Sequence, residues 1–504
     1  MILWRKTGYR LGDKVIKKSI QKNYIFNMIY QILTIIVPFV TTPYLSRVLG
    51  VSGIGLISYT NSIISYFTLF ENLGTATYAQ REIGYHQNDC ENRTRIFWEI
   101  LCIRFVMFIL TTFVYAWYCV SLKGDKTIYV ILAMNLFNAL LDVTWFFQGM
   151  ENFQIVVLRN VIFKIVNVCV IFLFVNKPED LYIYVLSTAL LSTFCSITTW
   201  IYLRKYLCRI SVRNLKPWRH LKGTIQLFLP TIAIQIYTVL DKSMIGIITG
   251  STVENGYYEQ ADKVMKICLT FVVSLGTVMI PRIANTYAQR NEELIKYYIY
   301  RSYRFVWLVS IPMFLGIAAV SDFFVPIFFG KGYDQVIVLL PIVSILLIII
   351  GLSNVTGQQY FVPTQQQDKL TKSVVVGAVV NLIVNALLIP RFASTGAALG
   401  SIIAECSVTF TQFIYLKREK KIQITRIFLE MWRYVVAGCA MFVVLLILKR
   451  YMSVEVCNLS VLVTLGGIIY CSILWLLRDE MLFSFISNIV KKIKRKNGEM
   501  LYKE

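Results

Sequence analysis

Apolar runs of about 20 residues recur along the whole chain and are separated by short polar stretches. A helix needs about 20 predominantly apolar residues to cross the hydrocarbon core of a bilayer, so each run predicts a membrane-spanning helix. Fourteen runs are predicted, and they begin near Tyr24, Ile54, Phe97, Thr127, Gln154, Leu181, Ile225, Tyr257, Phe305, Val336, Leu370, Gly396, Tyr434 and Leu459. The pattern therefore predicts an all-α polytopic membrane protein with about 14 transmembrane helices.

The composition agrees with this pattern, because 57% of the 504 residues are hydrophobic and 16% are charged. The formal net charge of +23 raises the question of whether the chain binds nucleic acid. With the amino terminus placed in the cytoplasm, most of the 51 Lys and Arg residues fall on the cytoplasmic side. Orientation in the membrane explains such a bias, so we expect no nucleic-acid partner and two cytoplasmic termini. The first span is expected to remain as an anchor, because no signal cleavage site is visible.

The two halves of the chain resemble each other weakly. A basic linker, residues 204–222, carries seven Lys and Arg and separates two sets of six predicted spans. The stretches RVLGVSGIG, LGTATYAQR and IYLRK in the first half have counterparts IITGSTVENG, LGTVMIPR and IYLKR in the second, in the same order. Because six is even, both halves enter from the same side of the membrane, which predicts a parallel repeat. We expect two six-helix lobes around a central cavity, plus two extra helices.

This reading divides the chain into seven segments. They are a basic amphipathic tail (1–23), an N-lobe (24–203), the basic linker (204–222), a C-lobe (223–416), a basic loop (417–433), two further helices (434–477) and a basic tail (478–504). The tails, the linker and the basic loop are expected in the cytoplasm. Glycines and prolines around the first hairpin, Gly50 among them, are expected to bend helices so that the lobes can rock.

Motifs for catalysis or metal binding are not found in the sequence. There is no G-x-x-x-x-G-K-[ST] phosphate loop, and the loops are too short for a soluble catalytic domain. The two histidines, His86 and His220, fall in predicted cytoplasmic loops, and no metal-ligand cluster accompanies them. The eleven cysteines are scattered without a C-x-x-C pair, and we expect them to be small buried hydrophobic residues. The sequence predicts neither an enzyme nor a cofactor or metal site.

Four stretches resemble a known family. They are TTPYLSRVLGVSGIG (41–55), LFENLGTATYAQREIG (69–84), DVTWFFQGMENF (142–153) and NLIVNALLIPRFASTGAALGSIIAE (381–405). They look like the Wzx-type polysaccharide flippases of the multidrug/oligosaccharidyl-lipid/polysaccharide exporter superfamily, and the resemblance covers essentially the first twelve spans.

The resemblance implies transfer of undecaprenyl-pyrophosphate-linked oligosaccharide repeat units from the inner to the outer leaflet, for O-antigen, capsule or a related polymer. It implies alternating access, a bacterial cell membrane location, and a polysaccharide polymerase and glycosyltransferases as candidate partners. Charged residues of the lumen would handle the pyrophosphate.

Several charges fall within the predicted spans, where a charged side chain costs roughly 2.5–3.5 kcal/mol at the membrane centre and therefore faces a cavity, a partner or a polar substrate. Asp241 and Lys242 interrupt the seventh run in the stretch VLDKSMIG. Lys242 and Lys263 are expected at a similar depth, roughly 12 Å from the tip of their hairpin. Asp262 and Lys266 are four residues apart and are expected to pair, which would leave Lys242 and Lys263 with the freer positive charge.

Cationic side chains are the candidates for pyrophosphate contact, because a cationic lining replaces the water that the phosphates lose. These candidates are Lys242, Lys263, Arg47, Lys266, Lys164 and Arg104, with Asp241, Asp262, Asp142 and Glu405 as charge partners in the cavity and Glu71 near a span end. Internal ion pairing, for example between Asp142 and Lys164, is the alternative role.

The segment Trp145–Glu151 is expected to close the fourth span at the cytoplasmic face. We expect Gly149 to end the helix and Gln148 and Glu151 to be exposed where substrate enters. Aromatic residues such as Trp145, Phe146, Phe147, Tyr257 and Tyr258 could line a sugar path or belong to the core and the interfacial belt.

Two other functions remain open at this point. A drug or cation antiporter of the same superfamily would use an acidic residue in an apolar lobe, for which Asp142 and Glu405 are candidates. The excess of Lys and Arg in the spans favours an anionic cargo instead. A membrane enzyme of polysaccharide assembly is disfavoured, because the predicted outer loops are short.

Overall fold

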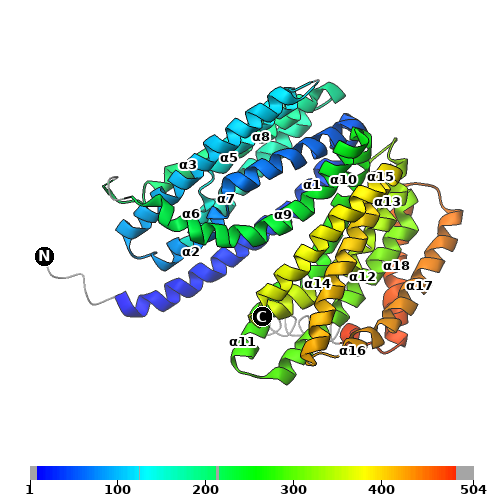
Figure 1. Cartoon of the computed structure of the whole chain (residues 1–504). Helices are drawn as coiled ribbons and strands as arrows, with labels where there is room; N and C mark the ends of the chain where they lie inside the picture. Colours follow the sequence, from blue (N-terminus) through cyan, green and yellow to red (C-terminus); the bar gives the residue numbers. More distant parts are fainter. Residues whose placement is uncertain (1–7, 124, 212–214, 484–504) are drawn as a thin grey trace, which may run out of the picture. The chain divides into compact units, whose positions relative to one another are not determined.

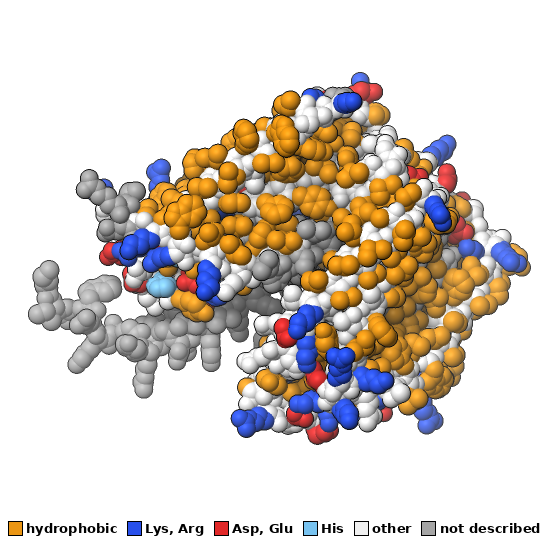
Figure 2. Space-filling model, viewed as in Figure 1, with side chains coloured by type: hydrophobic (Ala, Val, Ile, Leu, Met, Phe, Trp, Pro, Cys, Tyr) orange, Lys and Arg blue, Asp and Glu red, His pale blue; other side chains and the backbone are white. Residues whose placement is uncertain are grey.

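The computed structural model describes residues 8–123, 125–211 and 215–483, and its elements in these ranges are helices (Figure 1). Eleven helices in the described ranges are long and apolar enough to cross a membrane. Hydrophobic side chains cover the flanks of the helices in the face shown in Figure 2, whereas charged side chains gather near helix ends. This distribution is typical of a multi-pass membrane protein.

Two of the eleven helical segments each contain two of the predicted spans. Leu33–Tyr85 and Gln367–Glu419 have 53 residues each, which is about 80 Å of helix against a hydrocarbon core of about 30 Å. Both are kinked. Gly50 breaks the first at φ 67°, a conformation that glycine adopts without strain, and Ala393 breaks the second at φ 46°. The seventh predicted run forms a further helix, α9 (Leu221–Thr249), so the prediction of about 14 transmembrane helices is confirmed.

The first compact unit extends to Ser243. Its helices are α1 (Gly8–Asn72), α2 (Thr75–Tyr85), α3 (Cys90–Ser121), α4 (Thr127–Leu132), α5 (Met134–Leu141), α6 (Thr144–Gly149), α7 (Phe153–Phe174), α8 (Leu181–Leu203) and most of α9. One apolar cluster joins α1, α4, α5 and α8 around Leu136, and a second joins α2, α3 and α6 around Phe97 and Phe146. Because lipid is as apolar as these side chains, close packing rather than removal from water holds such helices together.

The second compact unit begins at Met244. It contains α10 (Thr252–Val273), α11 (Gly276–Ala288), α12 (Glu292–Phe328), α13 (Asp334–Ser344), α14 (Leu346–Asn354), η4 (Val355–Phe361), α15 (Gln367–Glu419), α16 (Ile424–Leu429), α17 (Met431–Leu448) and α18 (Val456–Leu476). The last two long helices, α17 and α18, pack on α12 and on each other. The boundary between the units falls within α9, whereas the sequence placed the start of its C-lobe at residue 223; the division into lobes remains a prediction.

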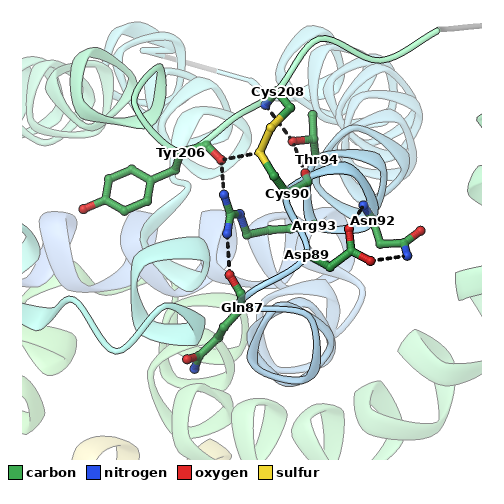
Figure 3. The surroundings of a disulfide bond; sticks show 8 residues. All are labelled: Gln87, Asp89, Cys90, Asn92, Arg93, Thr94, Tyr206 and Cys208. Atoms are coloured by element: carbon green, nitrogen blue, oxygen red, sulfur yellow. Dashed lines mark hydrogen bonds between the residues drawn. A yellow bond between two sulfur atoms is a disulfide. The ribbon is translucent and has the colours of Figure 1, made fainter. Parts of the chain in front are cut away.

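The basic linker is bound to α3 in the first unit. Cys90, the first residue of α3, forms a disulfide with Cys208 of the linker (Figure 3). Arg93 lies beside it and donates hydrogen bonds to the backbone oxygens of Gln87 and, at 2.5 Å, Tyr206 (Figure 3). The expectation that the cysteines are small buried hydrophobic residues is therefore wrong for this pair, because the fold brings together two residues 118 positions apart.

A second contact holds the linker further along α3, at Glu99. The carboxylate of Glu99 on α3 is fully buried and accepts hydrogen bonds from the Lys216 amide at 2.7 Å and the Arg219 guanidinium at 2.9 Å. Its other partner is His220, whose Nε2 lies 2.7 Å from Glu99 Oε2 and whose Nδ1 lies 2.9 Å from the hydroxyl of Tyr78. His220 is thus a buried structural residue at the start of α9.

Candidate functional site

The fourth predicted span is broken in the middle. Helix α5 ends at Leu141, α6 begins at Thr144, and Asp142 lies between them in an extended conformation. A helix end leaves carbonyl groups without partners, which is costly where water is absent. Side chains supply the missing donors: Trp200 Nε1 lies 2.8 Å from the oxygen of Leu141.

Arg104 on α3 supplies further donors for the carbonyl groups at the end of α5. Its Nη1 donates to the backbone oxygens of Ala139 at 3.2 Å and Asp142 at 2.6 Å. Nε and Nη2 donate to Thr75 at 2.8 Å and to the side-chain oxygen of Asn72 at 2.9 Å. All three guanidinium nitrogens are therefore engaged, and 2% of the residue is exposed. Arg104 could contact a pyrophosphate only by giving up these bonds, so we assign it a structural role at the break.

Glu71 on α1 is buried near the same guanidinium. It is 1% exposed, neither of its carboxylate oxygens has a hydrogen-bond partner within the described residues, and the charge of Arg104 acts on it. A carboxyl group buried without a hydrogen bond is costly when ionised, so Arg104 is the group that compensates it.

A cavity of about 600 Å³ opens at the break and is formed by α5, α6, α7 and α8. Most of its lining residues have polar side chains, namely Asn138, Asp142, Thr144, Gln148, Arg159, Asn160, Lys164, Asn167, Thr188, Ser192, Cys195 and Ser196, and Val156, Val157, Phe163 and Leu191 complete the lining. The fold thus brings together three predicted residues, Asp142, Lys164 and Gln148. The Asp142 carboxylate also accepts the Thr144 amide at 3.0 Å and so holds the start of α6.

Arg159 is a cavity residue that the sequence analysis missed. It is 8% exposed, and its guanidinium bonds to the Thr199 hydroxyl and, at 2.8 Å, to the side chain of Asn160. Arg159 stands five residues before Lys164 in the same apolar run. A search for charged residues within predicted spans, which selected Lys164, would therefore also have found Arg159.

The predicted gate segment agrees with the structure in part. Helix α6 ends at Gly149 and Glu151 is exposed, as expected, but Gln148 is half-buried in the cavity wall. Gly149 lies against α2, where an added Cβ would stand 2.7 Å from the backbone oxygen of Gln80. The left-handed residue after the helix is Glu151, at φ 55°. The role of Gly149 is therefore close helix packing.

The aromatic residues of this segment are in the core and do not line a path. Trp145, Phe146 and Phe147 are at most 1% exposed and pack with Phe97. Three bulky residues in one short helix can be buried together because Gly149 lets α6 approach α2 closely.

In the second unit, both predicted lysines of α10 have acidic neighbours on their own helix. Lys266 lies 2.8 Å from Asp262, as expected from their spacing. Lys263 lies 3.4 Å from Glu259, a residue that the sequence analysis did not consider, so the expectation that Lys263 carries freer charge is wrong. Tyr258 is buried and its hydroxyl lies 3.1 Å from that of Ser401.

The remaining predicted residues lie on three helices. On α9, Asp241 is buried and Lys242 is half-buried, and both belong to the first unit; on α1, Arg47 is exposed. Glu405 is half-buried on α15. Lys242 and Lys263 thus belong to different units, and their expected common depth remains a prediction.

Comparison with known proteins identifies the family. The profile of the family described as "Polysaccharide biosynthesis protein" matches residues 20–287, more than half of the chain. The chain belongs to this family. This confirms the resemblance to polysaccharide flippases that the four sequence stretches indicated.

Proteins that are similar in sequence to this family member carry transport names. A "Putative O-antigen transporter" of Escherichia coli K12 is 24% identical over 412 residues, which cover 80% of this chain and 98% of the relative. A "Probable low-salt glycan biosynthesis flippase Agl15" of Haloferax volcanii is 27% identical over 187 residues, covering 36% of this chain and 38% of the relative.

Solved structures share the fold of this family member. The lipid II flippase MurJ in an inward closed conformation superposes with a TM-score of 0.73 at 15% identity, covering 90% of this chain and 99% of that one. An inward-facing multidrug resistance transporter of the MATE family gives a TM-score of 0.62 at 12% identity, covering 77% and 94%. The fold is therefore that of multi-pass membrane transporters.

Proposed function

We propose that this protein is a flippase for lipid-linked oligosaccharides. It moves undecaprenyl-pyrophosphate-linked repeat units from the inner to the outer leaflet of a bacterial cell membrane by alternating access, with both termini in the cytoplasm. Membership of the polysaccharide biosynthesis family and the transporter fold support this proposal. The relatives' names support transport rather than catalysis, and we propose that the protein forms and breaks no covalent bond.

The observation that carries the proposal is the polar cavity inside the first unit. It brings two cationic side chains, Arg159 and Lys164, together with many amide and hydroxyl groups among helices that are otherwise apolar. Hydroxyl and amide groups can replace the water that sugar hydroxyls lose, and cations can do the same for phosphates. A drug antiporter would have less use for such a lining.

Pyrophosphate contact is proposed for Lys242, Lys263, Arg47, Lys266 and Lys164. Their charge partners would be Asp241, Asp262, Asp142 and Glu405. Gln148 and Glu151 would belong to the gate, and Gly149 would hold this segment by packing α6 against α2. Because Lys263 and Lys266 already have acidic neighbours, they would exchange these for the phosphate during transport. Lys242 and Lys164 are both half-buried.

The test is transfer of a labelled undecaprenyl-pyrophosphate oligosaccharide across proteoliposomes that contain the full chain. We expect transfer by the wild type and a loss of about tenfold or more in Lys164→Gln, because a desolvated charge-assisted contact is worth about 1.5–3 kcal/mol. Lys222→Gln, at an exposed position of α9, is the matched control and should transfer normally. Absence of transfer by the wild type, together with proton-driven export of cationic dyes, would favour the antiporter instead.

A further inference from the structure

A second cavity, of about 740 Å³, lies in the second unit where several helices begin or end. Its wall is formed by the first turns of α12, the residues that follow α15, α16 and the residues just after α18. These positions are the ends of membrane-crossing segments, so the cavity stands at the level of the lipid headgroups. Figure 2 shows Lys and Arg side chains gathered with Asp and Glu at this end of the second unit.

Ion pairs neutralise part of the basic lining. Arg304 pairs with Glu430 and, at 3.0 Å, with Glu480, while Lys296 lies 2.7 Å from Glu293. Lys421 pairs with Glu292. Lys421 lies in the connection between α15 and α16, and its hydrogen bond to Glu292 raises the pKa of its ammonium group. Half of the cations around the cavity are therefore engaged with carboxylates.

The other three cations, Arg301, Lys420 and Arg426, form no ion pair within 4.0 Å with any acid that the structure describes. Two of them are held by tyrosines. Arg301 donates to the hydroxyl of Tyr297 at 3.2 Å, and the guanidinium of Arg426 lies 4.6 Å from the ring centre of Tyr300.

Tyr300 is itself fixed, because its hydroxyl accepts the backbone amide of Gln423 at 2.8 Å. Two arginines held in place around a water-accessible cavity are suited to fork the oxygens of a phosphate group. The volume is within the roughly 300–1,000 Å³ typical of small-ligand sites.

We propose that this cavity is a binding site for a phosphate or diphosphate group at the membrane surface, held by Arg301, Arg426 and Lys420. The proposal goes beyond the flipping of a cargo, since it needs no passage through the membrane and concerns a cavity formed by the start of α12, α16 and the residues after α15 and α18. The phosphate can come from the headgroup of an anionic lipid or from a soluble diphosphate. In the first case the cavity would retain a lipid molecule, and in the second it would retain a soluble ion.

The alternative is that these charges serve orientation alone. In that case the orientation of the protein depends on the number of positive charges at this end and not on their positions around the cavity. A comparison between Arg301→Gln/Arg426→Gln and Lys417→Gln/Arg418→Gln separates the two readings. Both double variants remove two positive charges from the same end of the unit, but Lys417 and Arg418 are exposed and do not line the cavity.

The experiment uses the purified full chain in nanodiscs, with two measurements on each variant. Calorimetric titration with inorganic pyrophosphate in zwitterionic lipid reports a soluble source, and native mass spectrometry with added phosphatidylglycerol reports a lipid source. We expect Arg301→Gln/Arg426→Gln to weaken one of these by about tenfold or more, since charge-assisted contacts are worth about 1.5–3 kcal/mol each, and the control to change it less than about twofold.

Equal weakening in both double variants, or no binding of either probe to the wild type, would overturn the proposal. Melting temperatures are compared alongside, because Arg426 packs on Tyr300 and its loss could loosen the fold. Lys420→Gln is the second variant. Lys420 is exposed, follows the last residue of α15 and forms no ion pair with a described residue. The Lys420→Gln protein should therefore fold normally while its binding of the phosphate probe weakens. Unchanged binding in this well-folded variant would exclude Lys420 from the site. Unchanged binding in both Arg301→Gln/Arg426→Gln and Lys420→Gln would refute the proposal.

Discussion

At the scale of single residues, the first unit depends on charges that face each other inside the membrane. Arg104 satisfies the carbonyl ends of α5 and compensates the buried carboxyl of Glu71. Removal of one member of such a buried set is expensive, because the other is left without compensation. Stability and not transport should therefore be the first property to change.

We predict that Arg104→Gln lowers the free energy of unfolding by about 3–5 kcal/mol, the usual cost of breaking a buried charge pair. The melting temperature of the purified protein in detergent measures this. Glu71→Gln added to Arg104→Gln should recover part of the loss, since no buried carboxyl then remains. Lys222→Gln, exposed on α9 in the same unit, should melt like the wild type. A stable Arg104→Gln protein would contradict the assigned role.

Gly149 leads to a second prediction at this scale. If Gly149 only ended the helix at an entry gate, Gly149→Leu would impair transport and leave insertion intact, but a side chain here meets the Gln80 backbone at 2.7 Å and Ile83 at 2.9 Å. Overpacking costs about 1–3 kcal/mol or more, so we expect Gly149→Ala to lower the melting temperature and Gly149→Leu to reduce the yield of folded protein. Gly467→Leu on α18, where an added Cβ meets nothing within 4 Å, is the control. Equal yields for the two leucine variants would remove the packing argument.

At the scale of elements, the linker and the broken fourth span show how polar groups replace regular helix bonds. The linker is held to α3 by the Cys90–Cys208 disulfide and separately by Glu99. Disulfides seldom persist in the cytoplasm, where this linker is expected to lie. The contacts of Glu99 should therefore be the ones on which docking of the linker depends.

We predict that Glu99→Ala exposes the linker to limited proteolysis, because three donors lose their acceptor at once. Cys208→Ser should be cleaved at close to the wild-type rate under reducing conditions. The rate of cleavage between residues 204 and 222 is the measurement. Faster cleavage in Cys208→Ser than in Glu99→Ala would show that the disulfide is the main attachment.

At the scale of the whole molecule, the distribution of Lys and Arg predicts orientation. Tags at positions 212 and 425 should be cytoplasmic and a tag at 254 external; position 212 lies outside the described residues. Protection of these tags from an external protease on intact cells measures this. External cleavage at 425 would reverse the assignment of the second unit.

The two lysines that belong to different units lead to the last prediction. If Lys242 and Lys263 both hold the pyrophosphate, Lys242→Ala/Lys263→Ala should abolish flipping in proteoliposomes, and the corresponding arginine variant should retain part of it. Adding Asp241→Asn and Asp262→Asn to the double-alanine protein distinguishes contact with the pyrophosphate from compensation of the acidic charges. If restored flipping follows, the lysines merely compensate the acids; normal flipping by a well-folded double-alanine protein would exclude contact altogether.

The apolar runs of the sequence were enough to predict a helical membrane protein of about 14 spans, because span length and apolar composition are local properties that lipid imposes on each helix. Sequence reasoning also identified Arg104, Asp142 and Lys164, since charges are rare inside spans, but missed Arg159. Gly50 was recognised as a bend, because glycine adopts its positive φ without strain.

The surroundings of each charge, in contrast, follow only from the packing of the helices. Arg104 and Lys164 look alike in sequence, yet one is consumed by carbonyls 35 and 38 residues away and the other lines a cavity. Lys263 has its neighbour on its own helix, but Gly149 owes its role to α2, more than 60 positions earlier in the chain. Such roles depend on contacts between helices far apart in sequence, and no local pattern encodes them.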